Sequence, residues 1–119
     1  MELVVRAFPV LPGQEGRIQE LAKELRTDRA SEAADFYRRM GVTRESWHMQ
    51  ETPHGTWVIA VTWVLNKPVE VAAEVYAASQ DAFDRWFKQQ VMQVSGVNPE
   101  TTPLGPDTRC IFDSWATAG

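Results

Sequence analysis

Hydrophobic and polar residues alternate with a period of two at the start of the chain, between Glu2 and Phe8. This alternation predicts a β-strand with one buried face. Pro9 and Pro12 lack the N–H group that a sheet ladder needs, so we expect the strand to end there. The Pro12-Gly13 pair then predicts a turn into a helix.

Apolar residues recur at spacings of three and four between Gln14 and Met40, which predicts a helix, and Gly41 predicts its C-terminal end. A continuous helix of this length would measure about 40 Å, which is long for a small domain. The polar run 26–29 interrupts the apolar stripe. We therefore expect a kink or a break there, or an overhanging segment that meets a partner.

Two extended stretches, 44–52 and 56–65, predict a hairpin. The sequence Pro53-His54-Gly55 predicts a three-residue loop that places Thr52 opposite Thr56. A two-residue loop would shift these pairings and mix the faces, so the three-residue loop is favoured. The apolar face, expected to lie under the helices, carries Trp47, Met49, Glu51, Trp57, Ile59, Val61 and Trp63. The mixed face carries Arg44, Ser46, His48, Gln50, Val58, Ala60, Thr62 and Val64.

A second helical region is predicted from Lys67-Pro68 to a stop at Gly96. Ser79 is expected to cap a restarted helix that has Asp81 in its first turn. Residues 97–107 include three prolines and predict a loop. Residues 108–115 predict a last strand.

The element order β-α-β-β-α-β predicts a single α+β domain over residues 1–119 with a ferredoxin-like βαββαβ fold. Right-handed crossovers would place both helices on one face of a four-stranded antiparallel sheet. The other face would stay open and apolar, which usually marks an interface. We therefore expect a homodimer stacked sheet to sheet, and the alternative is a monomer with one wet face. The residues expected on the open face are Val4, Phe8, Val58, Ala60, Val64, Ile111 and Trp115.

Three features carry a resemblance to known proteins: the element order, the hairpin from Gly41-Val42-Thr43-Arg44-Glu45 to Glu51-Thr52-Pro53, and the segment 81–91. Together they resemble a family of small uncharacterised bacterial proteins of the dimeric α/β-barrel superfamily. That superfamily includes cofactor-free antibiotic-biosynthesis-type monooxygenases, haem-degrading enzymes and stress-responsive barrel proteins. The resemblance covers nearly the whole chain and implies a dimeric α/β barrel. It implies no particular reaction, because one fold serves many functions.

Composition and charge narrow the range of partners. The chain has 119 residues, of which 44% are hydrophobic, and a net charge of -4. Without a basic cluster it is poorly suited to nucleic acid or to an anionic membrane. A single cysteine, Cys110, rules out an intrachain disulfide, and residues 1–12 lack a signal-peptide pattern. We expect a cytoplasmic protein, and no cofactor is expected because no Gly-rich phosphate loop or dinucleotide fingerprint is present.

His48 is the first candidate for catalysis. The predicted register places it on the open face, beside Gln50 and across from the small side chain of Ala60, which would leave room for a ligand. A histidine there could act as a general base near neutral pH. The alternative is a partly buried histidine that is hydrogen-bonded in the dimer interface.

Arg6 and Asp113 are expected on the same open face, on neighbouring first and last strands. Arg6 would bind an anionic substrate, while Asp113 would orient a partner or a proton. The alternative is a cross-strand ion pair. Thr62 and Arg44 could complete a polar lining.

Other chemistry is less favoured. His48 and Glu51 face opposite sides of a strand, so no metal site is expected. Cys110 is expected to be a core residue of the last strand rather than a nucleophile. Asp81 and Asp84 are expected to be charges at a helix N-terminus rather than a catalytic pair.

Two functions remain open. The first is a small-molecule site in the barrel cavity, of the cofactor-free oxygenase or isomerase kind or for binding alone, lined by His48, Gln50 and Arg6. The second is a non-catalytic dimerisation or binding module, which the lack of a complete catalytic constellation favours.

Overall fold

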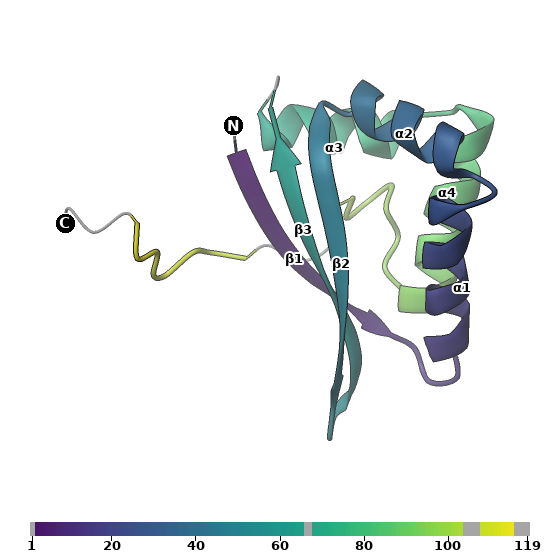
Figure 1. Ribbon diagram of the computed structural model, residues 1–119, viewed down its shortest axis with the longest axis vertical. Helices are drawn as coiled ribbons and strands as arrows, with labels where there is room; N and C mark the ends of the chain where they lie inside the picture. Colours follow the sequence, from purple (N-terminus) through teal and green to yellow (C-terminus); the bar gives the residue numbers. More distant parts are fainter. Residues whose placement is uncertain (1, 66–67, 104–107, 116–119) are drawn as a thin grey trace.

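The computed structural model describes residues 2–65, 68–103 and 108–115, which place a layer of helices on one face of a sheet (Figure 1). The predicted α+β class is confirmed. The strands are β1 (Glu2–Val10), β2 (Val42–Thr52) and β3 (Gly55–Val64). The helices are α1 (Glu15–Arg26), α2 (Ala30–Arg39), α3 (Val69–Ala78) and α4 (Ala82–Ser95).

The sheet is antiparallel and has the strand order β1-β3-β2, so β3 lies in the centre. Val58 of β3 pairs with Phe8 of β1 on one side and with Met49 of β2 on the other. Because side chains alternate along a strand, this register decides which residues the helices cover.

The hairpin register differs from the predicted one. Thr52 pairs with Gly55 rather than with Thr56, so the connection is the two-residue loop Pro53-His54. The Thr52 hydroxyl donates to the Gly55 carbonyl at 2.8 Å and accepts from the N–H of His54 at 3.1 Å. This one-residue difference turns every side chain of β3 to the other side relative to β2.

The two faces of the sheet therefore carry a different set of residues from the predicted one. Val4, Val58 and Val64 are buried under the helices, so their predicted place on the open face is wrong, as it is for Phe8 and Ala60. The helices bring their own large rings to this side, and small sheet residues leave room for them. The open face instead carries Leu3, Val5, Ala7, Trp57, Ile59, Val61 and Trp63 beside Arg44, Ser46, His48 and Gln50.

The expected interruption of the first helical region is confirmed as a break between α1 and α2. The carbonyl of Glu24 accepts the N–H of Thr27 at 3.3 Å and that of Arg29 at 2.8 Å, which closes the last turn of α1. The Arg29 guanidinium lies 3.9 Å from the ring centroid of Trp86 on α4. This cation–π contact ties the break to the neighbouring helix.

The second helical region also divides as expected, into α3 and α4. Ser79 follows the end of α3 and does not cap α4, because its hydroxyl is hydrogen-bonded to the buried side chain of Asp84. Gly96 ends α4 in the left-handed conformation, with φ of 75°, as predicted.

The described residues 108–115 form no strand, so the predicted last strand is wrong for this segment. The Thr108 hydroxyl donates to the backbone carbonyl of Val5, and the chain then leaves the sheet on the side opposite the helices (Figure 1). A strand needs a neighbouring edge for its backbone groups, and none of the described strands continues along this direction. Cys110, Ile111 and Trp115 are exposed, contrary to the packed positions that the sequence predicts.

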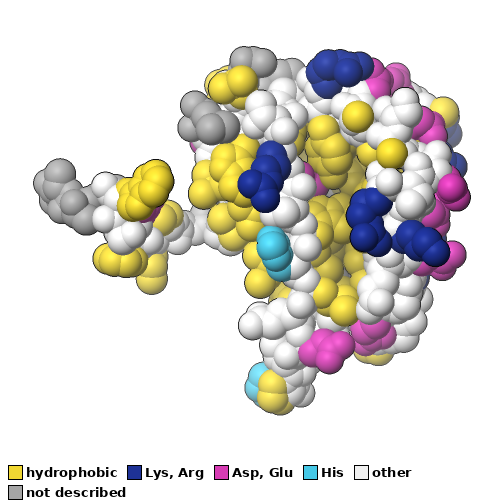
Figure 2. Space-filling model, in the orientation of Figure 1, with side chains coloured by type: hydrophobic (Ala, Val, Ile, Leu, Met, Phe, Trp, Pro, Cys, Tyr) yellow, Lys and Arg dark blue, Asp and Glu magenta, His cyan; other side chains and the backbone are white. Residues whose placement is uncertain are grey.

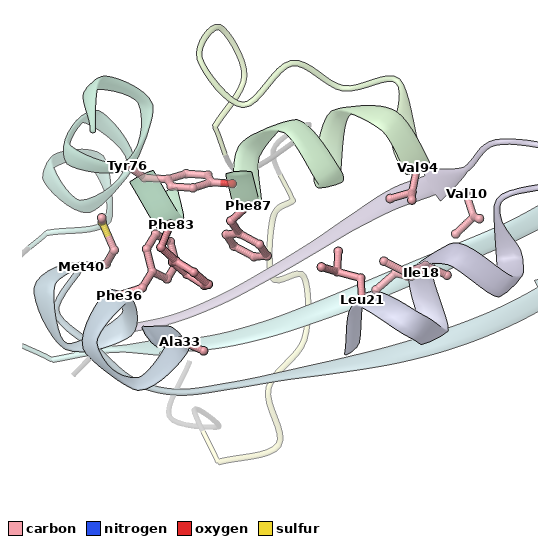
Figure 3. Packing of buried hydrophobic residues seen from close by; sticks show 11 residues of the cluster. Val10, Ile18, Leu21, Ala33, Phe36, Met40, Tyr76, Phe83, Phe87 and Val94 are labelled. Carbon is pink, nitrogen blue, oxygen red and sulfur yellow. The ribbon is translucent and has the colours of Figure 1, made fainter. Parts of the chain in front are cut away.

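The core under the sheet has an aromatic end and an aliphatic end (Figure 3). Phe36 lies at the centre of the aromatic end, with its ring centroid 5.2 Å from that of Phe87 and 5.6 Å from that of Tyr76. Leu21 is fully buried at the aliphatic end, where it lies near Val94. A pocket opens beside the aromatic end, which contributes Phe36, Tyr76 and Phe87 to its lining.

Candidate functional site

A pocket lies between the sheet and the helical layer, with a cavity volume of about 120 Å³. That is close to the roughly 150 Å³ of an apolar cavity that admits one benzene ring. Figure 2 shows hydrophobic side chains in the hollow between the strands and the helices. The lining residues are Val4, Arg6, Phe8, Phe36, Tyr37, Met40, Val42, Glu45, Trp47, Ala60, Thr62, Val64, Val69, Ala72, Tyr76, Phe87, Val91, Val97, Pro99, Thr102 and Pro103.

The space exists because small side chains stand where the layers meet. Ala60 lies in the centre of the sheet, between Arg6 of β1 and Trp47 of β2, and Ala72 faces the same cavity from α3. A larger side chain at either position would project into the cavity. The mostly apolar lining with a few polar groups is typical of small-molecule sites.

Glu45 is the main polar group of the pocket. One of its oxygens accepts the Tyr37 hydroxyl at 2.6 Å and the Trp47 indole N–H at 2.9 Å. The other oxygen accepts the Thr62 hydroxyl at 2.7 Å. An ionised carboxylate has about four acceptor positions, so these three donors leave about one for a ligand.

Two tyrosines stand near this carboxylate. Burial raises the pKa of Tyr37 well above its usual range, and the charge of Glu45 raises it further. Burial and the charge of Glu45 raise the pKa of Tyr76 in the same direction. Both phenols are therefore neutral at physiological pH, and the Tyr37 hydroxyl donates its hydrogen bond to Glu45.

Aromatic rings form one wall of the pocket. The indole of Trp47 stacks on Phe87, with ring centroids 6.1 Å apart and planes 8° apart, and meets the edge of Phe8 at 6.3 Å. The hydrogen bond from Trp47 to Glu45 fixes the indole in this position. A flat ring inserted here would find faces and edges suited to aromatic packing.

The predicted site residues are divided between two faces and the C-terminal segment. Arg6 and Thr62 line the pocket under the helices. His48, Gln50 and Arg44 lie on the open face, as predicted, but on the opposite side of the sheet from Arg6 and Thr62. Asp113 lies in the exposed segment that leaves the sheet, where its carboxylate accepts the N–H of Trp115 at 2.9 Å.

The histidine and arginine of the open face have local partners. His48 is exposed and pairs with Ile59 rather than with Ala60, and its Nε2 lies 3.0 Å from the Ser46 hydroxyl. The Arg44 guanidinium lies 4.8 Å from the ring centroid of Trp63. The small neighbour that was expected to make room for a ligand beside His48 is thus on the other face.

Sequence reasoning missed Glu45, Tyr37 and Tyr76. The two-residue loop would have revealed Glu45, because that register pairs it with Thr62 on the face of β3 that carries Ala60. Tyr37 and Tyr76 belong to apolar helix stripes, and the pattern alone does not separate them from ordinary core residues.

A second cluster of charges lies at the junction of α2, α3 and α4. The buried carboxylate of Asp84 accepts both terminal nitrogens of Arg39 at 2.8 Å. The buried ammonium of Lys88 donates to the carbonyls of Ala77 and Ser79 at 3.0 and 2.8 Å. Each of these groups is satisfied within the protein, so the cluster joins helices.

Within the described part of the chain, no group of three or more His, Cys, Asp or Glu residues could hold a metal ion. Among the same residues, no helix has the length and hydrophobicity needed to cross a membrane. Comparison with protein-family models, with curated proteins and with solved structures found no match.

Proposed function

We propose that the protein binds a small aromatic molecule carrying one hydroxyl or amino group in the pocket beneath its helices. The observation that carries the proposal is the carboxylate of Glu45, which faces a mostly apolar cavity and is held by three donors. The cavity volume suits about one ring.

The chemistry of the ligand follows from the lining. The aromatic wall of Trp47, Phe87 and Phe8 favours a flat apolar body. The open acceptor position of Glu45 favours a group that donates a hydrogen bond. A hydrogen bond to a charged group contributes about 1.5–3 kcal/mol, so the donor should improve affinity about tenfold or more over an apolar ligand of the same size.

Phenol and toluene test this, because they have the same number of heavy atoms and differ in the donor. Amide chemical shifts in an NMR titration give the affinity and the location of each compound. Phenol is expected to bind about tenfold more tightly than toluene, and to shift signals of residues around Ala60 and Thr62. Equal affinities, or shifts confined to another surface, would contradict the proposal.

Two substitutions with a control localise the effect. Glu45→Gln should remove most of the preference for phenol, whereas Glu51→Gln, the same change on an exposed residue of the same strand, should not. Ala60→Leu fills the cavity from the sheet and should abolish binding of both compounds while the thermal unfolding temperature is maintained. Binding that survives Ala60→Leu would place the ligand elsewhere.

We also propose that two chains pair through their open sheet faces, as ferredoxin-like protomers of a dimeric α/β barrel. The support is the apolar surface of that face: Leu3 is 56% exposed, and Val5 and Trp57 are 38% exposed. Such a surface usually marks an interface. Sedimentation equilibrium should show a dimer, and Val61→Asp should convert it to a monomer that still binds phenol. If wild type sediments as a monomer at high concentration, the pairing is wrong.

This pairing would also serve a non-catalytic dimerisation module, the second candidate function. The phenol titration separates the two, because a module without a ligand site would give no saturable shifts around Ala60.

A further inference from the structure

The C-terminal arm, defined as the described residues 108–115, has large apolar side chains that the rest of the described chain leaves exposed. Ile111 is 85% exposed, Phe112 is 80% exposed and Trp115 is 95% exposed. The Cys110 thiol donates to the carbonyl of Phe112, and the N–H of Trp115 donates to the Asp113 carboxylate, both inside the arm. Three such side chains within five residues are costly to leave in water.

The arm has a fixed origin and a definite direction. Thr108 is held at β1, where its hydroxyl donates to the Val5 carbonyl and accepts from Arg6 at 3.4 Å. From there the arm runs away from the helices, on the side of the sheet that carries the open face (Figure 1). It therefore points into the space that a second chain would occupy in the proposed sheet-to-sheet dimer.

We infer that the C-terminal arm packs on the open sheet face of a second copy of this chain, and that the two copies exchange arms reciprocally. This inference rests on the proposed pairing and adds the element that completes its interface.

The area of the interface supports the exchange. Three strands about 4.8 Å apart, with about nine residues each rising 3.3 Å, give the sheet face a footprint of roughly 430 Å². A standard interface buries about 800 Å² on each partner. Phe112 and Trp115 can bury about 150–250 Å² each, so the arm supplies roughly the missing half.

Charge complementarity also supports packing of the arm on the open face of a second copy. The arm has one charge of each sign: Arg109 is next to its origin at Thr108, and Asp113 lies between Phe112 and Trp115 nearer its end. The open face of the second copy presents Arg44 and His48 along β2. An arm packed on that face would bring the Asp113 carboxylate to the Arg44 guanidinium while its rings cover Ile59 and Val61.

A mixed-label NMR experiment tests the exchange directly. Cys110 is the only cysteine in the chain and is exposed in the arm, so it accepts a nitroxide label. Labelled chains without ¹⁵N are mixed with ¹⁵N-labelled Cys110→Ser chains, which makes any paramagnetic broadening intermolecular. Amide signals of the open face, such as those of Val5 and Ile59, are expected to broaden.

The other outcomes contradict the exchange. Broadening that occurs only when nitroxide and ¹⁵N share a chain would show that the arm folds back on its own sheet. Intermolecular broadening confined to another surface, or none at all, would show that the arm does not reach the face of a second copy.

A triple substitution gives the energetic test. Ile111→Ser, Phe112→Ser and Trp115→Ser together keep the arm's length and should weaken the dimer at least tenfold in sedimentation equilibrium. The matched control replaces three exposed apolar residues of the helices by serine, and it should leave the dimer unchanged: Val71, Val75 and Met92. An unchanged dimer in the arm variant would overturn the exchange and leave sheet pairing intact. A monomeric wild type would overturn both.

Discussion

Replacing Asp84 by asparagine removes the charge that joins α2 to α4. The side chain is 0% exposed, and its oxygens accept Arg39 twice at 2.8 Å as well as the Ser79 hydroxyl. Removing one member of a buried ion pair costs about 3–5 kcal/mol. Arg39 keeps Asp35 and Asp81 as partners and is 32% exposed, so we expect the lower end, about 3 kcal/mol.

Urea unfolding followed by circular dichroism measures this loss. With a denaturant slope of about 2 kcal/mol per molar, the midpoint should fall by roughly 1.5 M. Asp81→Asn is the control, because Asp81 contacts the same arginine at 3.2 Å but is 61% exposed. An exposed pair contributes below about 1 kcal/mol. Equal losses in the two variants would refute the argument that burial makes the Asp84 contact strong.

Asp84 should also make the stability of the fold depend on pH. Burial alone would raise the pKa of Asp84, but hydrogen bonds from Arg39 and Ser79 outweigh burial and lower the pKa below its ordinary value. The unfolded chain thus binds this proton more tightly than the folded protein does. The stabilisation is fully present above the unfolded pKa of about 3.9 and is lost as the pH falls through the lower, folded pKa. The stability difference between wild type and Asp84→Asn should therefore shrink below about pH 4.

Two further predictions concern the aromatic end of the core. Phe36→Ala should lower the free energy of unfolding in urea by about 3–5 kcal/mol, because Phe36 is buried among the other rings. The control Phe112→Ala, in the exposed arm, should change the stability of the monomer by less than about 0.5 kcal/mol. Similar losses in the two variants would show that Phe36 is not central to the core. The second concerns the protein's two tyrosines, Tyr37 and Tyr76, whose pKa values burial raises. They favour the folded state below the unfolded pKa of about 10, and this stabilisation is lost as the pH rises through their folded pKa values. Tyrosinate absorbance should therefore appear together with alkaline unfolding, and ionisation of the native protein near pH 10 would contradict the burial argument.

Local signals in the sequence were sufficient to predict most of the helical layer. Gly41 and Gly96 mark helix ends, and the polar run 26–29 marks the break between α1 and α2, because these features act through the backbone of a few neighbouring residues. The hairpin required a choice between two loops that differ by one residue. Sorting by hydrophobicity favoured the wrong loop, since it placed Trp57 and Trp63 in the core.

The space that the helices leave free, rather than hydrophobicity, decides which residues of β3 face the core. Phe36, Phe83 and Phe87 already occupy much of the space above the sheet, so the central strand presents the small Ala60 and Thr62 on that side and turns its tryptophans outward. The candidate site could not be predicted for the same reason, because Glu45 changes face with the register. The segment 108–115 could not be predicted for a different reason, since its alternation is that of a strand but no strand of the described sheet pairs with it.

The pocket also predicts how the folded protein responds to hydrostatic pressure. Its 120 Å³ amounts to roughly 70 mL per mole, and the volume by which unfolding shrinks a protein under pressure, about 20–100 mL per mole, scales with such internal space without being equal to it. Compression should therefore loosen the layers around Ala60 and Ala72 before it affects the tightly filled aliphatic end around Leu21. A molecule that fills the space would make the fold more resistant to pressure as well as to heat.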